Sequence, residues 1–284
     1  MGREETAGPA GRGLRDTRIR RPAVAGSFYP ADATELSRTV DALLDRVRAG
    51  AEEPRPVALV APHAGYVYSG PVAAEAYARV RGLEVRRVIL LGPAHFVPLR
   101  GMAVPGTTAW ETPLGAVPVD PELREVAAGA GAIVDDHPHA AEHAIEVQVP
   151  FLLRALGEGW TFLPVAVGVA RAQEVAGLLE RLRGPADLVV VSTDLSHYLD
   201  DSSARRADRT TAEAVLRVDP DGIGEGSACG RYPLRGLLAH ASRSGLAPRL
   251  LRLGTSADAS GETSGVVGYG AFAFACVAAR RALG

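Results

Sequence analysis

The sequence predicts a single α/β domain in which a mixed central β-sheet is flanked by helices. Short apolar runs typical of buried strands alternate with amphipathic stretches along the whole chain, with no break in composition. Three of these runs, residues 57–61, 88–92 and 189–192, each end in a turn that carries a histidine. The 284 residues, 47% of them hydrophobic, are enough for one large core, which we place in residues 21–284. Residues 1–20, rich in Gly, Arg and Glu, are expected to be a disordered tail.

Composition excludes several classes of protein. The formal net charge of −2 gives no global basic field for nucleic acid. No apolar run reaches the roughly 18 residues that a membrane helix needs, and the polar N-terminus shows no secretory signal. The two cysteines, Cys229 and Cys276, form neither a CxxC motif nor a disulfide framework. These features predict a cytoplasmic protein with reduced thiols.

The first part of the chain predicts a helix followed by a strand–helix–strand unit. Residues 32–48 carry apolar side chains at helical spacing, and Asp32 followed by Glu35 resembles a capping box. The next strand, helix and strand are expected over residues 57–61, 73–81 and 85–91. This order is a βαβ unit, which implies parallel pairing of its strands.

The remaining elements continue the alternation. Residues 102–119 predict a hairpin or loop excursion, and 135–142 a polar loop. Residues 144–156 predict a helix that begins late or kinks at Pro150. The other expected helices span residues 121–130, 172–183, 203–218 and 231–242. The other expected strands span residues 132–134, 161–167, 187–192, 249–253 and 265–277, the last being a strand or a hairpin.

Three histidines, His63, His95 and His197, follow predicted strands. Ligands of open α/β sheets bind outside the carboxyl ends of the strands, so these imidazoles are expected to converge. Two imidazoles with one anionic ligand suit non-haem iron, and zinc accepts a similar set. The third ligand could be Asp194 or Cys229. Small residues flank Cys229, and the start of the helix that follows would favour its thiolate.

Other polar residues near these turns suggest supporting roles. Asp194 and His197 lie in one turn, where a carboxylate can raise the pKa of an imidazole used as general acid or base. Glu142 and His143 are expected to line the pocket or to orient a ligand. Tyr66 could form part of a wall for a flat ring, or could simply pack.

Two hydrolase classes are not expected. The segment HAAEHAIE, residues 139–146, would place His139 and His143 one turn apart if it were helical. Its glutamate precedes the second histidine instead of following the first, so it does not match the HExxH motif of zinc proteases. A serine hydrolase is not expected either, because the sequence has no GxSxG elbow.

Six ordered motifs resemble the Memo family, whose bacterial and archaeal members are called AmmeMemoRadiSam system protein B. They are AGSFYP (25–30), PHAGY with YSG (62–70), LGPAH (91–95), EHAIEVQVPFL (142–152), STDLSHY (192–198) and ACGRYP (228–233). The resemblance covers residues 21–279. It implies a fold similar to that of the class III extradiol (LigB-type) dioxygenases, iron(II) enzymes that open catechol rings with dioxygen.

The resemblance also implies roles for individual residues. The two histidines and the cysteine that bind metal in Memo proteins fall on His63, His95 and Cys229, and the pocket aspartate and histidine on Asp194 and His197. The dioxygenases use a glutamate as third ligand, where this sequence has Cys229. Iron(II) is the first metal expected, with copper and zinc as alternatives. The family name further implies a functional link to an AMMECR1-like protein and a radical SAM enzyme.

Three hypotheses of function follow. The first is a non-haem iron oxidoreductase, dioxygenase-like, that acts on a small substrate, for which an aromatic or phenolic ring is one option. Its proton transfers would use His197 and Asp194. The second is a non-catalytic metal- or ligand-binding adaptor, because animal relatives are described as signalling adaptors. The third is a zinc hydrolase.

Overall fold

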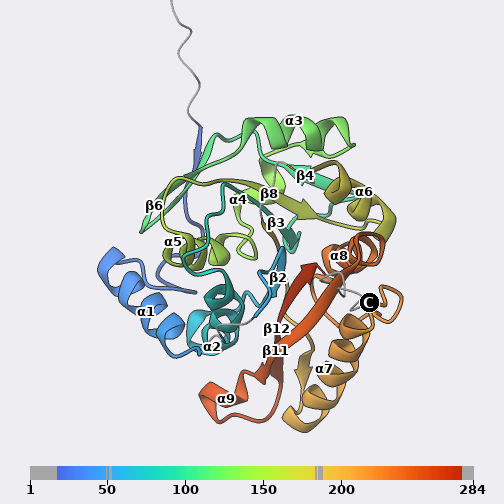
Figure 1. Cartoon of the computed structure of the whole chain (residues 1–284). Coiled ribbons are helices and arrows are strands. Elements are labelled where there is room, and N and C mark those ends of the chain that lie inside the picture. The colour runs from blue at the N-terminus through green and yellow to red at the C-terminus, as the bar shows by residue number, and fades with distance from the viewer. Residues whose placement is uncertain (1–17, 49, 51–52, 183, 185–187, 277–284) are drawn as a thin grey trace, which may run out of the picture.

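The structure, a computed structural model, describes residues 18–48, 50, 53–182, 184 and 188–276. It is a single α/β domain whose mixed central sheet is flanked by helices, which confirms the predicted fold class (Figure 1). Residues 1–17 of the predicted tail lie outside the described residues. Its last two residues, Ile19 and Arg20, form a short strand, β1, that pairs with β5.

The described residues form a nine-stranded sheet in the order β10-β12-β2-β9-β3-β8-β4-β7, with β11 paired to β12, and a three-stranded sheet β1-β5-β6. Strands β2, β9, β3 and β8 run parallel, whereas β12 is antiparallel to β2, and β4 to β8. The strands of the large sheet are β2 (Ala58–Ala61), β3 (Arg87–Pro93), β4 (Met102–Val104), β7 (Ile133–Val134), β8 (Thr161–Val167), β9 (Leu188–Ser192), β10 (His197–Leu199), β11 (Leu246–Thr255) and β12 (Val266–Cys276). Those of the small sheet are β1 (Ile19–Arg20), β5 (Ala109–Thr112) and β6 (Gly115–Pro118).

The two strands of the predicted βαβ unit are parallel, as expected, but they do not pair with each other. Strands β2 and β3 are parallel members of one sheet, but β9 lies between them and pairs with both. All the residues of β9 are apolar except its last, Ser192, and the strand is largely buried. Such a strand suits the centre of a parallel sheet, which is covered on both faces.

Helices cover both faces of the large sheet (Figure 1). Alternate residues of β2 point to opposite sides: Leu59 packs with α1, α2 and α5, and Val60 with α6 and α8. The α-helices are α1 (Ala33–Asp45), α2 (Tyr66–Tyr77), α3 (Pro121–Gly129), α4 (His137–Ala140), α5 (Val149–Leu156), α6 (Ala172–Leu182), α7 (Asp201–Leu216), α8 (Arg231–Ser244) and α9 (Ala257–Ser260). Within the described part of the chain, none of them is long and apolar enough to cross a membrane.

Helix ends follow local chemistry where the sequence supplies it. The Asp32 side chain accepts a hydrogen bond from the Glu35 N–H at 2.9 Å and caps α1, as predicted. Residues 146–148 form a 3₁₀ turn and α5 begins at Val149, so the helix expected over 144–156 does begin late, with Pro150 in its first turn.

The start of one helix and one predicted loop differ from the structure. The helix predicted over residues 73–81 is present but starts earlier: α2 begins at Tyr66, contains Pro71 and buries Ala73 and Ala74 against the core. The segment 135–142, expected to be a loop, contains the short helix α4.

Candidate metal centre

The candidate site lies at the carboxyl ends of three adjacent parallel strands, β2, β9 and β3. His63 follows β2, Asp194 follows β9 and His95 follows β3. The backbone N–H of His63 donates to Asp194 Oδ1 at 2.7 Å, and the rings of His63 and His95 have their centroids 5.2 Å apart. The strand-end pattern in the sequence thus brings these residues together, as expected.

Cys229 reaches the same place from the loop before α8. Its Sγ lies 3.2 Å from His63 Nε2. The ligand atoms of His63, His95 and Cys229 all lie within 4.8 Å of one another. Donors that share one ion at roughly 2.0–2.3 Å lie up to about 4.6 Å apart, so an upper limit of 4.8 Å puts these three donors near the spacing of a common metal site.

A close backbone approach at Gly230 places this cysteine. A Cβ on Gly230 would lie 2.7 Å from Thr193 Cβ and 2.9 Å from the Ser192 carbonyl oxygen, so only glycine fits without displacement. The Gly230 N–H donates to Thr193 Oγ1 at 2.8 Å, and the Cys229 N–H to the Asp194 carbonyl at 3.2 Å. The loop before α8 is therefore held against the end of β9.

The hydrogen bonds around His63 decide which ring nitrogen can bind a metal. Ser192 Oγ donates to the Ala144 carbonyl at 2.5 Å and accepts from Gln148 Nε2 at 2.7 Å. A hydroxyl has one proton, so its contact of 2.9 Å with His63 Nδ1 is one in which Nδ1–H donates. Nε2 of His63 then keeps its lone pair and faces Cys229 Sγ.

His95 is oriented in the same way by Glu142. The Glu142 carboxylate accepts from His95 Nδ1 at 2.9 Å and from the His95 backbone N–H at 2.6 Å. An ionised carboxylate only accepts, so Nδ1 of His95 carries the proton and Nε2 remains for a ligand. Burial alone would raise the pKa of Glu142, but the bonds from His95 outweigh it and the net shift is downward. Glu142 thus orients His95, a candidate metal ligand.

Burial governs the protonation of Cys229 and Asp194. It raises the pKa of the Cys229 thiol to about 12, and the neighbouring Asp194 carboxyl adds to the rise. It also raises the pKa of Asp194 to about 7, against the hydrogen bond from the His63 backbone. A bound cation deprotonates a coordinating thiol, and the Asp194 N–H, 3.3 Å from Sγ, would then donate to the thiolate.

His197 stands beside this cluster. It lines a cavity of about 290 Å³ together with Cys229. Its Nδ1 lies 2.9 Å from the Leu195 carbonyl, which can only accept, so Nε2 is left as a base. Burial lowers the pKa of His197 in spite of that bond. Among the described residues, the Asp194 carboxylate, expected to raise the pKa of His197, instead accepts from the His63 backbone N–H, and the Leu195 carbonyl orients the His197 ring.

His143 contacts the candidate ligands, whereas the contacts of Tyr66 lie elsewhere. The ring of His143 stacks on His95 with centroids 4.9 Å apart and also contacts Phe28 at 4.8 Å. Tyr66 is buried, and its hydroxyl donates to the Val147 carbonyl at 2.5 Å. Tyr66 also lines a separate groove of about 530 Å³ between α1 and α2.

The segment 139–146 is not one helix, so His139 and His143 do not share a helical face. His139 lies in α4, buried, with its ring centroid 5.7 Å from that of Trp110. Glu146 faces the other way and accepts from Arg20 Nη1 at 2.8 Å and from the Tyr29 hydroxyl at 2.6 Å. This segment therefore contributes only His143 and the supporting Glu142 to the site.

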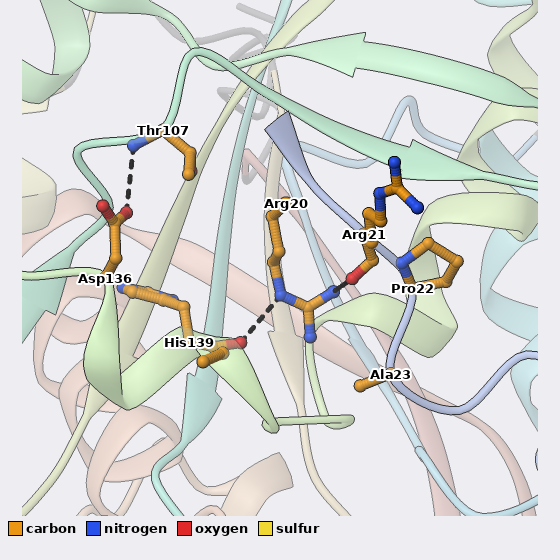
Figure 2. A pocket seen from close by; sticks show the side chains of 8 residues that line it. Arg20, Arg21, Pro22, Ala23, Thr107, Asp136 and His139 are labelled. Carbon is orange, nitrogen blue, oxygen red and sulfur yellow. Dashed lines mark hydrogen bonds between the residues drawn. The ribbon is translucent and has the colours of Figure 1, made fainter. Parts of the chain in front are cut away.

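Residues that the sequence reasoning missed hold this segment in place. Arg20 Nε donates to the His139 carbonyl at 2.7 Å (Figure 2). Its Nη2 donates to the Glu142 carbonyl at 2.7 Å. Arg20 also lies 4.2 Å over the Trp110 ring and lines a cavity of about 420 Å³ with Asp136. Gln148 lies in the motif EHAIEVQVPFL, so the sequence did hold a signal for it. Arg20 carried no such signal, because it lies in the predicted tail.

The fold and the donor set together define an α/β protein with a candidate metal centre of two histidines and one cysteine. The sequence model of the family described as "Memo-like protein" matches residues 20–273. The chain therefore belongs to the Memo-like protein family, which confirms the resemblance seen in its motifs.

Relatives match over most of their length. A MEMO1 family protein of Methanopyrus kandleri is 35% identical over 278 residues, which cover 90% of this chain and 98% of that protein. One of Aquifex aeolicus is 39% identical over 209 residues, or 72% and 77% of the two chains. A solved structure of an uncharacterized Escherichia coli K12 protein has a TM-score of 0.46 and 13% identity, over 84% of this chain and 92% of that one. That similarity is too weak to show a shared fold.

Proposed function

We propose that this chain is a metal-dependent oxidoreductase whose non-haem iron(II) is held by His63, His95 and Cys229. The convergence of these three donor atoms within 4.8 Å is the observation that supports it. Two imidazoles and a thiolate are a donor set that iron(II) accepts, and copper and zinc compete for it. Bound iron would supply redox chemistry, dioxygenase-like in kind, toward a small substrate, for which an aromatic or phenolic ring is one option.

The chain's own residues would prepare the ligands and move protons. Ser192 and Glu142 hold the two imidazoles with Nε2 unprotonated. His197, whose pKa is lowered by burial, is neutral at pH 7 and so can accept a proton at Nε2 from a substrate in the adjoining cavity. Asp194, with a pKa raised to about 7 by burial, can hold or release a proton next to Cys229.

The test combines metal analysis with turnover. Protein loaded anaerobically with iron(II) is analysed for bound metal and then assayed for oxygen uptake with a panel of catechols and phenols. Replacement of His63, His95 or Cys229 should remove bound metal, whereas His197→Ala should keep the metal and lose the rate. If no metal form consumes oxygen with any compound of the panel, the oxidoreductase proposal fails.

The same variants separate this proposal from the other two hypotheses. A non-catalytic binder would keep its ligand affinity in His197→Ala and show no turnover in the wild type. A zinc hydrolase would contain zinc when isolated from its native host. The cytoplasmic location and the functional link to an AMMECR1-like protein and a radical SAM enzyme remain predictions.

A further inference from the structure

The cavity next to the candidate metal centre has a charged residue that the proposed chemistry leaves unused. The cavity measures about 290 Å³ and is lined by His197, Glu225, Gly226, Ala228, Cys229 and Arg231. The lining thus includes a candidate metal ligand, Cys229, and the proposed base, His197. Arg231 brings a guanidinium to the same small space. A volume at the lower end of ligand pockets suits a compact molecule of one ring or less.

The guanidinium of Arg231 is held in place by its neighbour. Its Nη2 donates to the Tyr232 hydroxyl at 2.9 Å, and its Cζ lies 4.8 Å from the centre of the Tyr232 ring. Stacking on an aromatic ring restricts a side chain that otherwise has many rotamers. The Arg231 side chain is only 27% exposed. It is therefore preorganised at the cavity, unlike a mobile surface arginine.

The anionic partner of Arg231 within the protein is weak. Glu225 Oε1 lies 3.6 Å from Arg231 Nη1, and the Glu225 side chain is 92% exposed. Exposed ion pairs of this kind contribute little, because water and salt screen them. A guanidinium has five N–H donors in a planar fork, so most of its donor capacity remains for a ligand.

We propose that Arg231 binds the carboxylate of a small substrate whose reacting part lies at the metal centre, an inference that rests on the proposed metal-dependent function. The planar fork of a guanidinium matches a carboxylate in a two-point hydrogen bond. A dianionic phosphate fits less well, because Arg231 alone would have to balance its two charges. The Glu225 carboxylate, which lines the same cavity, would also repel it. The first peptide groups of α8, which begins at Arg231, add a partial positive charge there.

The test uses matched pairs of ligands that differ in the carboxylate. Calorimetric titrations of the metal-loaded full chain would compare 3,4-dihydroxybenzoate with catechol and benzoate with benzamide, with inorganic phosphate as a further probe. The wild type should bind the acids more tightly than their neutral partners. Arg231→Gln should weaken acid binding by about 10- to 100-fold and leave catechol binding unchanged, as expected for loss of a charge-assisted hydrogen bond. Arg231→Lys, which keeps the charge but not the fork, should fall between.

Arg235→Gln is the matched control. Arg235 lies one turn further along α8, bonds Asp221 at 2.8 Å and does not line this cavity, so its replacement should not change acid binding. Equal binding of acids and neutral partners, or acid binding that survives Arg231→Gln, overturns the proposal, and so does phosphate binding tighter than that of every acid. Metal content, measured on each sample, is a separate readout. If the wild-type protein does not hold metal after loading, the proposed metal-dependent function itself is refuted.

Discussion

A single hydroxyl, that of Ser192, fixes the tautomer of His63. It is fully buried, its proton goes to the Ala144 carbonyl, and its lone pairs accept from Gln148 and His63. A metal-binding histidine commonly has its second nitrogen bonded in this way, which orients the ring and raises its basicity. The chemistry of the site therefore depends on a residue that does not itself reach the metal position.

Ser192→Ala tests this arrangement. It removes the acceptor of His63 Nδ1–H, so the ring loses its orientation and we expect metal affinity to fall about 10- to 100-fold. Competition titration against a chromophoric chelator measures the change. Ser202→Ala, at an exposed serine that bonds Asp200, is the matched control and should bind metal like the wild type. An unaltered affinity in Ser192→Ala would show that the tautomer is set in another way.

His139 makes a second prediction at the scale of one residue, about pH. Burial, with the nearby charge of Arg20, lowers its pKa to about 4, whereas an unfolded histidine titrates near 6.5. The unfolded chain therefore binds a proton first as the pH falls, so stability is lost between about pH 6.5 and pH 4 at up to about 1.4 kcal/mol per pH unit. Urea unfolding across this range should show a shallower slope for His139→Phe than for the wild type. His137→Phe, at an exposed histidine, should keep the wild-type slope.

At the scale of the element, Arg20 of β1 joins the N-terminal strand to the segment that supports the site. It donates to the carbonyls of His139 and Glu142 and forms a buried ion pair with Glu146 at 2.8 Å. Glu142 in turn orients His95. A two-residue strand thus acts on a candidate metal ligand, His95, through a chain of direct contacts.

Arg20→Met should destabilise the protein by about 3–5 kcal/mol, because it leaves the Glu146 carboxylate buried without its cation. Guanidinium unfolding measures this. Arg20→Met combined with Glu146→Gln should recover part of the loss, since the stranded charge is gone. Arg21→Met, at the exposed neighbouring arginine, is the control and should change stability little. A small effect of Arg20→Met would mean that β1 is not needed to hold the segment.

The same elements show what could be predicted from the sequence. Strand ends followed by His63 and His95 were predictable, because apolar runs and turn residues are local signals. The insertion of β9 between β2 and β3, and the pairing of the short strand β10 with β12, depend on contacts between distant segments. So does the part played by Arg20, whose partners are more than 100 residues away. Cys229 became a candidate ligand from small flanking residues and a family motif, and its distance from His63 required the fold.

At the scale of the whole molecule, the three candidate ligands come from separate parts of the chain. His63 and His95 follow strands β2 and β3. Cys229 comes much later in the chain, after β9 and just before α8. An ion held by all three would bind the folded chain and not the unfolded one. Such binding stabilises by RT ln(1 + [L]/Kd), about 4 kcal/mol at 1,000 times Kd.

Thermal unfolding with and without metal therefore tests the centre as a property of the fold. We expect iron(II), added anaerobically, or zinc to raise the Tm of the wild type by several degrees, and Cys229→Ser to lose most of that rise. Cys276→Ser is the matched control, because Cys276 is the other free thiol and lies exposed at the end of β12. If the rise followed Cys276, the metal would be binding an exposed thiol. If it survived both substitutions, the ion would be held without sulfur, by the second cluster of donors, His95, Glu142 and His143. Only a rise in Tm that requires Cys229 would indicate that the loop before α8 and the two strand ends form one metal site.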